Sequence, residues 1–498
     1  MKITLKVSTL PKTETDLLVI SLFEDNLLSP LTVFDTSFVN LVSEAMKKEG
    51  FTGKDGEKLI LSSLGKISAY KILFQGLGKS KDFNLDKLRK FSANAVKKAI
   101  NQKSTRLSVV LSEDLYNNLS SEDVAFTTSE AIYLSFYRFL KYKSREEQEK
   151  SILPEEVELI VSPGKLSSSE KALATAFVTS DATIYARNLI NEPSDVTTPA
   201  HLAEKALDLV KLSKGTIKVK ITDKAEAHKM GMGGFLGVAR GSDEPPKFIR
   251  LSYKPAKSKA KIVLVGKGIT FDTGGLSLKS AEHMETMKLD MAGAAAVMGI
   301  FKAIYEMKPE VEVIGMIAAT ENMPSGKALK PGDILKTVSG KTIEVLNTDA
   351  EGRLTLADCL SLAVLEKPDA IIDLATLTGA CMVALGQNIA GAFSNDVKLM
   401  ERVKKASRQT GEKIWELPLE KDYKELIKSH IADLRNISSG RYGGAITAAL
   451  FLSEFVGTTP WVHLDIAGPA YEEKNTPLVA QGGAGFGVRT VMKFLMDY

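Results

Sequence analysis

The first third of the chain alternates short apolar runs with longer stretches of mixed polarity. The apolar runs are rich in Val, Ile and Leu, which is typical of strands. The intervening stretches have helical spacing, as in residues 85–100. Strands that alternate with helices predict an α/β layer whose sheet is largely parallel. The predicted strands are 2–7, 16–23, 69–75, 106–112 and 156–162.

A second α/β pattern begins near residue 196 and continues to the C-terminus. Several of its apolar runs are nearly continuous, which is typical of strands that are buried on both faces. The pattern predicts a larger domain with a central mixed sheet flanked by helices. The predicted strands are 216–222, 247–253, 261–266, 311–319, 342–346, 370–377 and 461–468, and the predicted helices are 291–307, 354–366 and 446–456.

The segment between the two patterns is rich in Ser, Gly and Pro at residues 162–170, which predicts a linker. A long helix is predicted over residues 171–191, because the helical spacing stops before Pro193. A chain of 498 residues is too long for one ordinary core. The fold class is therefore α/β with two domains: residues 1–165, a linker helix region at 166–195, and residues 196–498.

Composition narrows the possible partners and ligands. The formal net charge of +4 on 498 residues is too small to indicate nucleic acid or a membrane as the main partner. Residues 1–16 alternate like a strand and lack a secretory signal, and only two cysteines occur, so a reducing cytoplasm is expected. The five histidines include no pair at HExxH spacing, so any bound metal should have mostly carboxylate ligands.

The octapeptide NTDAEGRL, residues 347–354, places three charges between a predicted strand and a predicted helix. Ligands of α/β sheets bind at the carboxyl ends of strands. If the segment is extended, Asp349, Glu351 and Arg353 project to one side, and the two carboxylates repel unless a cation lies between them. Alternatively, Asp349 caps the helix and Arg353 forms a surface ion pair.

Two further segments also place charged residues next to the end of a predicted strand or the start of a predicted helix. Lys267, Asp272 and Lys279 follow the strand 261–266, and Gly274–Gly275 provides a tight turn. Asp290 stands just before a helix of small residues, where the alternative interpretation is an ordinary N-cap. Because three strand or loop exits each supply carboxylates, we expect them to form one shared site.

Four carboxylates can hold two divalent cations about 3.5–4 Å apart, the usual hydrolytic pair. Carboxylates alone suit magnesium or manganese, whereas a lysine nitrogen among the ligands favours zinc, manganese or cobalt. A coordinating lysine must be neutral, so the ions must depress its pKa.

These three segments together resemble the leucine aminopeptidase (cytosol aminopeptidase) family of dinuclear metallopeptidases. The resemblance covers residues 180–498 and is weak over 1–165, where only length and the α/β pattern agree. The segments that carry it are 186–203, 232–242, 265–279, 287–297, 347–354, 373–380, 443–452, 461–468 and 483–489.

The resemblance implies a role for each charged residue. Asp272 and Glu351 would bridge two divalent ions, zinc or manganese, with magnesium or cobalt as alternatives. Lys267 and Asp290 would complete the tighter site, and Asp349 the more exchangeable one. The resemblance further implies that Lys279 binds the substrate carbonyl and the developing oxyanion, and that Arg353 holds a bicarbonate ion acting as general base.

The resemblance also implies the substrate and the assembly. Peptides with a free N-terminus would lose one residue, because their amine binds the tighter metal and places the first carbonyl beside the other. The family assembles as a hexamer. An apolar pocket would receive the N-terminal side chain, although Met287 is also readable as core, and Ala470 stands where some relatives carry methionine. The implied substrate-binding residues are Met287, Asn347, Thr376, Gly379 and Ala467.

Three other interpretations remain open at this point. A dinuclear phosphoesterase could use four carboxylates, but it would normally add histidines, and none lies in the three segments. Some relatives bind DNA, which the weak net charge does not support and a salt-dependent gel shift would test. An inactive scaffold with the same fold would usually have lost one of the metal or catalytic positions, and here all are present.

Overall fold

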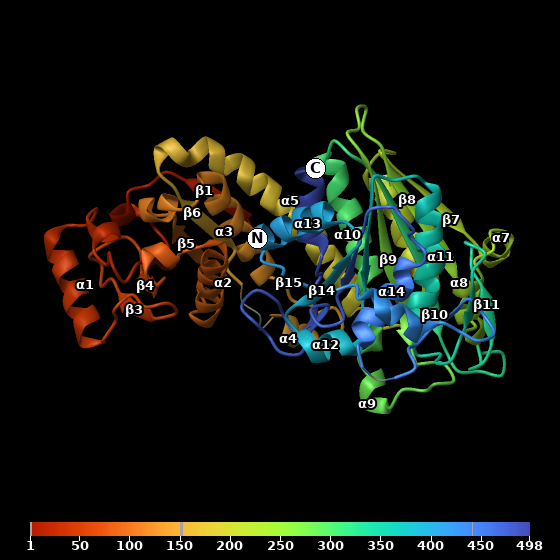
Figure 1. Ribbon diagram of the computed structural model, residues 1–498. Helices are drawn as coiled ribbons and strands as arrows, with labels where there is room; N and C mark the ends of the chain where they lie inside the picture. The colour runs from red at the N-terminus through yellow and green to blue at the C-terminus, as the bar shows by residue number, and fades with distance from the viewer. Residues whose placement is uncertain (1, 150–152, 441) are drawn as a thin grey trace. The chain divides into compact units, whose positions relative to one another are not determined.

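The computed structural model describes residues 2–149, 153–440 and 442–498. The chain divides into two compact units (Figure 1). The first contains Met1–Ser180 with Asn475–Ala480, and the second contains Asp181–Lys474 with Gln481–Tyr498. The boundaries 1–165, 166–195 and 196–498 stay a prediction.

The N-terminal unit is built around a six-stranded sheet in the order β1-β6-β5-β2-β4-β3. All neighbouring strands are parallel except β3 and β4, so the expected largely parallel sheet is confirmed. The edge strand β3 was not predicted. The strands are β1 Lys2–Lys6, β2 Leu17–Leu22, β3 Lys58–Ser62, β4 Lys71–Gly76, β5 Arg106–Val110 and β6 Glu156–Ile160.

The central strand β2 is buried along its whole length because helices cover both faces of this sheet. Leu17 and Val19 join a core with α2 (Leu85–Asn101) and α3 (Ser121–Ser135), whereas Leu18 and Ile20 pack with α1 (Thr36–Lys48). Alternate residues of a strand point to opposite faces, which explains the division. A short helix, α4 (Arg145–Glu149), follows α3 along the chain.

The Ser-rich segment 162–170, which was predicted to be a linker, is mainly helical. Helix α5 spans Leu166–Asn191 and begins five residues before the predicted start, directly after a 3-10 turn at Pro163–Lys165. The hydroxyl of Ser168 donates to the carbonyl of Lys165 at 3.1 Å, so this serine bonds to its own backbone without leaving the helix.

The second unit has the predicted central mixed sheet, whose eight strands lie in the order β15-β14-β17-β13-β9-β10-β8-β7. Strands β14 and β15 were not predicted. The central strands β17, β13, β9 and β10 are parallel, and β8 pairs antiparallel with both β10 and β7. At the other edge, β14 pairs antiparallel with β17 and parallel with β15. The strands are β7 Ile217–Thr222, β8 Lys247–Tyr253, β9 Lys261–Asp272, β10 Glu312–Asn322, β13 Ala370–Ala375, β14 Ala390–Ser394, β15 Ile414–Glu416 and β17 Trp461–Asp465.

Helices flank this sheet on both faces (Figure 1). Val263 and Val265 of β9 share a core with α8, α11 and α14. On the other face, Gly266 lets the start of α10 approach, since a Cβ there would lie 2.6 Å from the carbonyl oxygen of Gly293. The helices are α6 Pro199–Leu212, α7 Lys224–Lys229, α8 Gly233–Val238, α9 Ala281–Met284, α10 Ala292–Met307, α11 Gly352–Leu365, α12 Gly379–Leu385, α13 Val397–Thr410, α14 Gly444–Ser453 and α15 Val488–Met496.

The strand predicted at 342–346 is shorter and lies outside the large sheet. It is β12 (Thr342–Glu344), the middle strand of a small sheet with β11 (Ile334–Lys336) and β16 (Leu434–Arg435). A further pair joins β18 (Tyr471–Glu472) to β19 (Gly482–Gly483).

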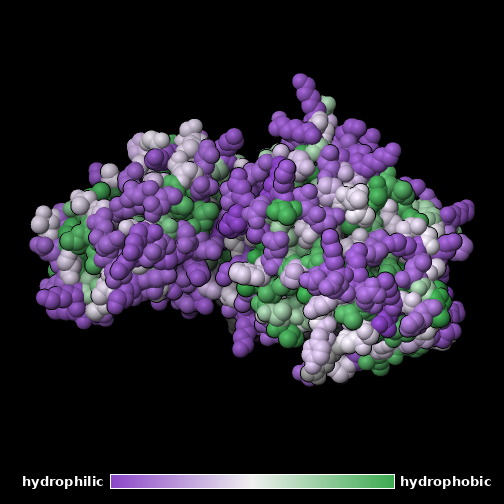
Figure 2. Space-filling view, viewed as in Figure 1, coloured by the Kyte–Doolittle hydropathy of each residue, from purple (hydrophilic) through white to green (hydrophobic). Residues whose placement is uncertain are grey.

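Hydrophilic residues dominate the face shown in Figure 2, with apolar residues in scattered patches. Among the described residues, no helix combines the length and apolarity needed to span a membrane. Both cysteines, Cys359 and Cys381, are buried and free.

Candidate functional site

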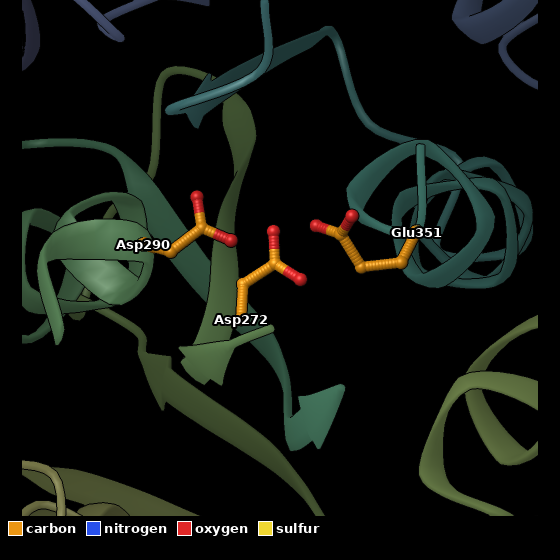
Figure 3. A group of neighbouring side chains, drawn as sticks. All are labelled: Asp272, Asp290 and Glu351. Carbon is orange, nitrogen blue, oxygen red and sulfur yellow. The ribbon is translucent and has the colours of Figure 1, made fainter. Parts of the chain in front are cut away.

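Three carboxylates from separate segments converge at the carboxyl end of β9. Asp272 is the last residue of that strand, Asp290 lies in a 3-10 turn (Met287–Met291) before α10, and Glu351 directly precedes α11. Figure 3 shows their side chains pointing toward one another. One oxygen of each lies within 4.8 Å of the others, and no more than 4% of any of the three residues is exposed.

The ammonium of Lys267 lies among these carboxylates. Its Nζ donates to Asp290 Oδ1 at 2.7 Å and to the carbonyl of Thr376 at 2.9 Å, and it lies 2.9 Å from Glu351 Oε1. Burial alone would lower the pKa of Lys267, but its three acidic neighbours raise it above its ordinary value. Burial raises the pKa of Asp290 well above its ordinary value, with Lys267 opposing the shift. The lysine is therefore the counter-charge of the cluster.

A second lysine, Lys279, is the counter-charge at the mouth of the cluster. Its Nζ lies 2.8 Å from Asp272 Oδ2 and also pairs closely with Asp349. Gly274 and Gly275, at φ of +85° and +64°, turn the chain back so that Lys279 can reach these oxygens. Burial opposes the charge on Lys279, but the carboxylate of Asp272 raises its pKa overall. Burial likewise raises the pKa of Asp349.

The octapeptide is not extended, and the capping interpretations are wrong. Residues 348–349 form a turn, in which the N–H of Ala350 donates to the carbonyl of Asn347 at 3.3 Å. Helix α11 begins at Gly352 after an N-cap at Glu351, so Asp349 does not cap it. Asp290 is not a cap either, because α10 has Met291 at that position and the Asp290 carboxylate accepts from Lys267.

Arg353 is buried and forms no surface ion pair. Its Nη1 donates to the carbonyl of Asn436 at 2.7 Å, while its Nε has no hydrogen-bond partner among the described residues. Burial lowers the pKa of Arg353 to about 10, and the nearby Glu351 and Asp465 carboxylates counteract this shift. A planar anion that accepts from a guanidinium edge would fit this residue.

The carboxylates also have acceptor capacity that the described protein atoms leave unused. Asp290 Oδ2 and both oxygens of Glu351 are buried without a hydrogen bond to the described residues, although Lys267 Nζ forms an ion pair with Glu351 Oε1 at 2.9 Å. Unsatisfied buried carboxylate oxygens are costly. Divalent cations would satisfy them, so the donor set fits a metal centre.

A cavity of about 840 Å³ opens beside the cluster. Its walls include the predicted charged residues Lys267, Asp272, Lys279, Asp290, Asp349 and Arg353, and the predicted substrate residues Met287, Asn347, Thr376, Gly379 and Ala467. Glu351 is not among the lining residues, and Ala470 is fully buried outside them. All the predicted residues are thus gathered in one place, although their roles stay predictions.

Comparison with known families decides the class of this chain. Residues 184–492 match the model of the cytosol aminopeptidase family, catalytic domain, and residues 19–146 match that family's N-terminal domain. The chain belongs to the cytosol aminopeptidase family. Members of this family are metallo-aminopeptidases, so the chain is a metal-dependent hydrolase that acts on peptide bonds.

Two relatives in the family align with this chain over nearly the full length of both proteins. A probable cytosol aminopeptidase of Alkaliphilus oremlandii is 43% identical and covers 99% of this chain and 98% of its own. One from Aquifex aeolicus is 45% identical, with 94% and 93% covered.

Solved structures agree with the fold of this family member. A tomato leucine aminopeptidase mutant has a TM-score of 0.89 at 35% identity, with 100% of this chain and 97% of its own covered. The bottromycin maturation enzyme BotP in complex with Mn has a TM-score of 0.85 at 32% identity, with 97% and 99% covered.

Sequence reasoning missed the polar residues that hold the acids of this family member in place. Asn322 donates to Asp272 Oδ1 at 2.8 Å and to the carbonyl of Thr348 at 3.0 Å. Thr376, predicted only to bind substrate, donates to Asp290 Oδ1 at 2.8 Å. Asn322 ends β10 opposite Asp272, but the predicted strands 261–266 and 311–319 stop short of both residues, so the predicted pairing did not reach them.

Proposed function

We propose that this family member is a leucyl-type aminopeptidase that removes N-terminal residues with a water molecule activated at two divalent ions. The observation that carries the proposal is the convergence of Asp272, Asp290 and Glu351, with buried unsatisfied oxygens, beside a substrate-sized cavity. Divalent ions bound there would polarise a carbonyl and lower the pKa of water.

The proposed ligands divide between two sites. Asp272 and Glu351 would be shared by both ions, Lys267 and Asp290 would complete the tighter site, and Asp349 would complete the more exchangeable one. Zinc or manganese suits this set, with magnesium or cobalt as alternatives. The manganese complex of the related BotP supports the choice of manganese.

Two cationic side chains act on the substrate and on its base in this proposal. Lys279 lines the cavity next to Asp272 and Asp349, where its ammonium would bind the peptide carbonyl oxygen and the charge that develops on it. Arg353 would hold a bicarbonate ion through its unpartnered Nε, and that ion would supply the general base.

The proposed reaction requires a free N-terminal amine, which gives a direct test. Leucine p-nitroanilide should be hydrolysed, whereas N-acetyl-leucine p-nitroanilide should not, because an acetylated amine is a poor ligand and loses its anchor. The rates of p-nitroaniline release measure both reactions. Equal rates would contradict the exopeptidase assignment, and phosphatase activity without anilide hydrolysis would favour the phosphoesterase.

Metal affinity should rise with pH, because protons compete with metal for the same atoms. Burial raises the pKa of Asp272 and Asp290, so these acids take up protons at higher pH than usual, and metal is lost as pH falls through that range. The raised pKa of Lys267 means that its proton must leave when metal binds. Calorimetry in buffers of different ionisation enthalpy should therefore show net proton release, and binding without it would argue against Lys267 as a ligand.

We further propose that the chain acts in the cytoplasm as a homohexamer on peptide substrates with a free N-terminus. Full-length family relatives named cytosol aminopeptidase support the compartment. Sedimentation equilibrium should give six times the chain mass of 54.0 kDa. A monomer that retains full activity would contradict the assembly.

A further inference from the structure

Asn436 joins the small sheet to the loop that carries Asp349 and Glu351. It directly follows β16, and its backbone N–H donates to the carbonyl of Glu344 at 3.0 Å, extending the pairing with β12 by one bond. The residue is completely buried. Its side chain then crosses to the octapeptide loop.

The side-chain amide of Asn436 uses all of its hydrogen-bonding capacity on that loop. Its Oδ1 accepts from the N–H groups of Leu346 at 2.9 Å and Asn347 at 3.4 Å. Its Nδ2 donates to the carbonyls of Asn347 at 2.6 Å and Ala350 at 3.3 Å. A side-chain amide can accept two hydrogen bonds and donate two, whereas an isosteric carboxylate can only accept.

The backbone of the same residue holds Arg353, because its carbonyl accepts from Nη1 at 2.7 Å. The loop has an independent anchor on its other side. Thr348 Oγ1 donates to the carbonyl of Gly274 at 2.6 Å, and the N–H of Ser277 donates to Thr348 Oγ1 at 2.8 Å. Loss of the Asn436 amide should therefore shift the loop without releasing it.

We propose that Asn436 is a positioning residue that sets the spacing of Asp349, Glu351 and Arg353. The proposal rests on the proposed function, because those three residues act as metal ligands and anion holder only there. Buried partners that orient ligands typically change metal affinity by about 10- to 100-fold. Asn436 contacts no predicted ligand side chain and acts through the backbone that carries them.

Asn436→Ala tests this role, with Asn395→Ala as a control for the loss of an asparagine amide that holds a loop. Asn395 also clamps a loop, since its Oδ1 accepts from Trp461 N–H at 2.8 Å and its Nδ2 donates to the carbonyl of Thr459 at 2.9 Å. It does not line the cavity. The full-length proteins are compared for melting temperature, for zinc and manganese affinity by chelator competition, and for kcat and KM on leucine p-nitroanilide.

Asn436→Ala should weaken metal binding and lower kcat, each by about tenfold or more, at a temperature where it is fully folded. Asn395→Ala should lower only the melting temperature. If Asn436→Ala does not fold, Asn436→Asp, which keeps the shape and the two accepted bonds, should show the same losses. A folded Asn436 variant with wild-type metal affinity and kcat overturns the positioning role alone. A wild-type protein that binds no metal overturns the proposed function as well.

Discussion

Lys279→Ala is expected to lower kcat by about 10²- to 10³-fold while the protein keeps its metal, the loss typical of removing one oxyanion donor. In the structure, Lys279 Nζ pairs with oxygens of Asp272 and Asp349, two of the proposed metal ligands. The lysine therefore competes with metal for these atoms. Removing it should leave metal content unchanged or raise it, and kcat measured together with elemental analysis checks both expectations.

Lys341→Ala is the control for the loss of a partly buried, ion-paired lysine. Its Nζ lies 2.7 Å from Glu454 Oε2, and it does not line the cavity. This variant should keep both metal and kcat. If Lys279→Ala instead loses metal in proportion to kcat, Lys279 supports the metal centre and does not act on the substrate.

Asp290→Asn is expected to empty the tighter site and to abolish most activity. The substitution keeps the shape but removes a charge that faces Lys267 at 2.7 Å and an oxygen, Oδ2, that has no described partner. As a direct ligand, Asp290 should matter more than an outer partner, so affinity for one ion should fall by more than about 100-fold. Elemental analysis after dialysis should show one ion lost.

Asp358→Asn separates this effect from the loss of any buried acid. Asp358 is fully buried in α11 and accepts from the N–H groups of Phe235 at 2.8 Å and Val338 at 2.9 Å. It does not line the cavity, so its variant should lose stability and keep both ions. Two tightly held ions in Asp290→Asn would refute the assignment of Asp290.

The sequence located the site because the acids stand at the ends of buried segments, and such ends gather at one edge of a sheet. Asp272 illustrates this, since it was expected just after the predicted strand 261–266, and it is in fact the last residue of the longer β9. The conformation of the octapeptide could not be predicted from the sequence. Its turn depends on the side chains of Asn436 and Thr348, whose partners lie far away in the sequence.

One helix start was placed too late. The helix was predicted from residue 171, yet α5 begins at Leu166 and includes the serines at 167–169. Local composition favours a loop there. The Ser168 hydroxyl instead bonds to the backbone of the preceding turn, so its hydrogen bond is satisfied while the chain stays helical. The burial of Arg353 was equally hidden, because a charged residue near a helix start is usually exposed.

The most direct test is anomalous diffraction from crystals of the active enzyme loaded with zinc or manganese. Two peaks about 3.5–4 Å apart are expected, with Asp272 and Glu351 contacting both. Lys267 and Asp290 should lie at one peak and Asp349 at the other. A single peak, or none within reach of Glu351, in crystals of fully active enzyme would contradict the two-metal centre.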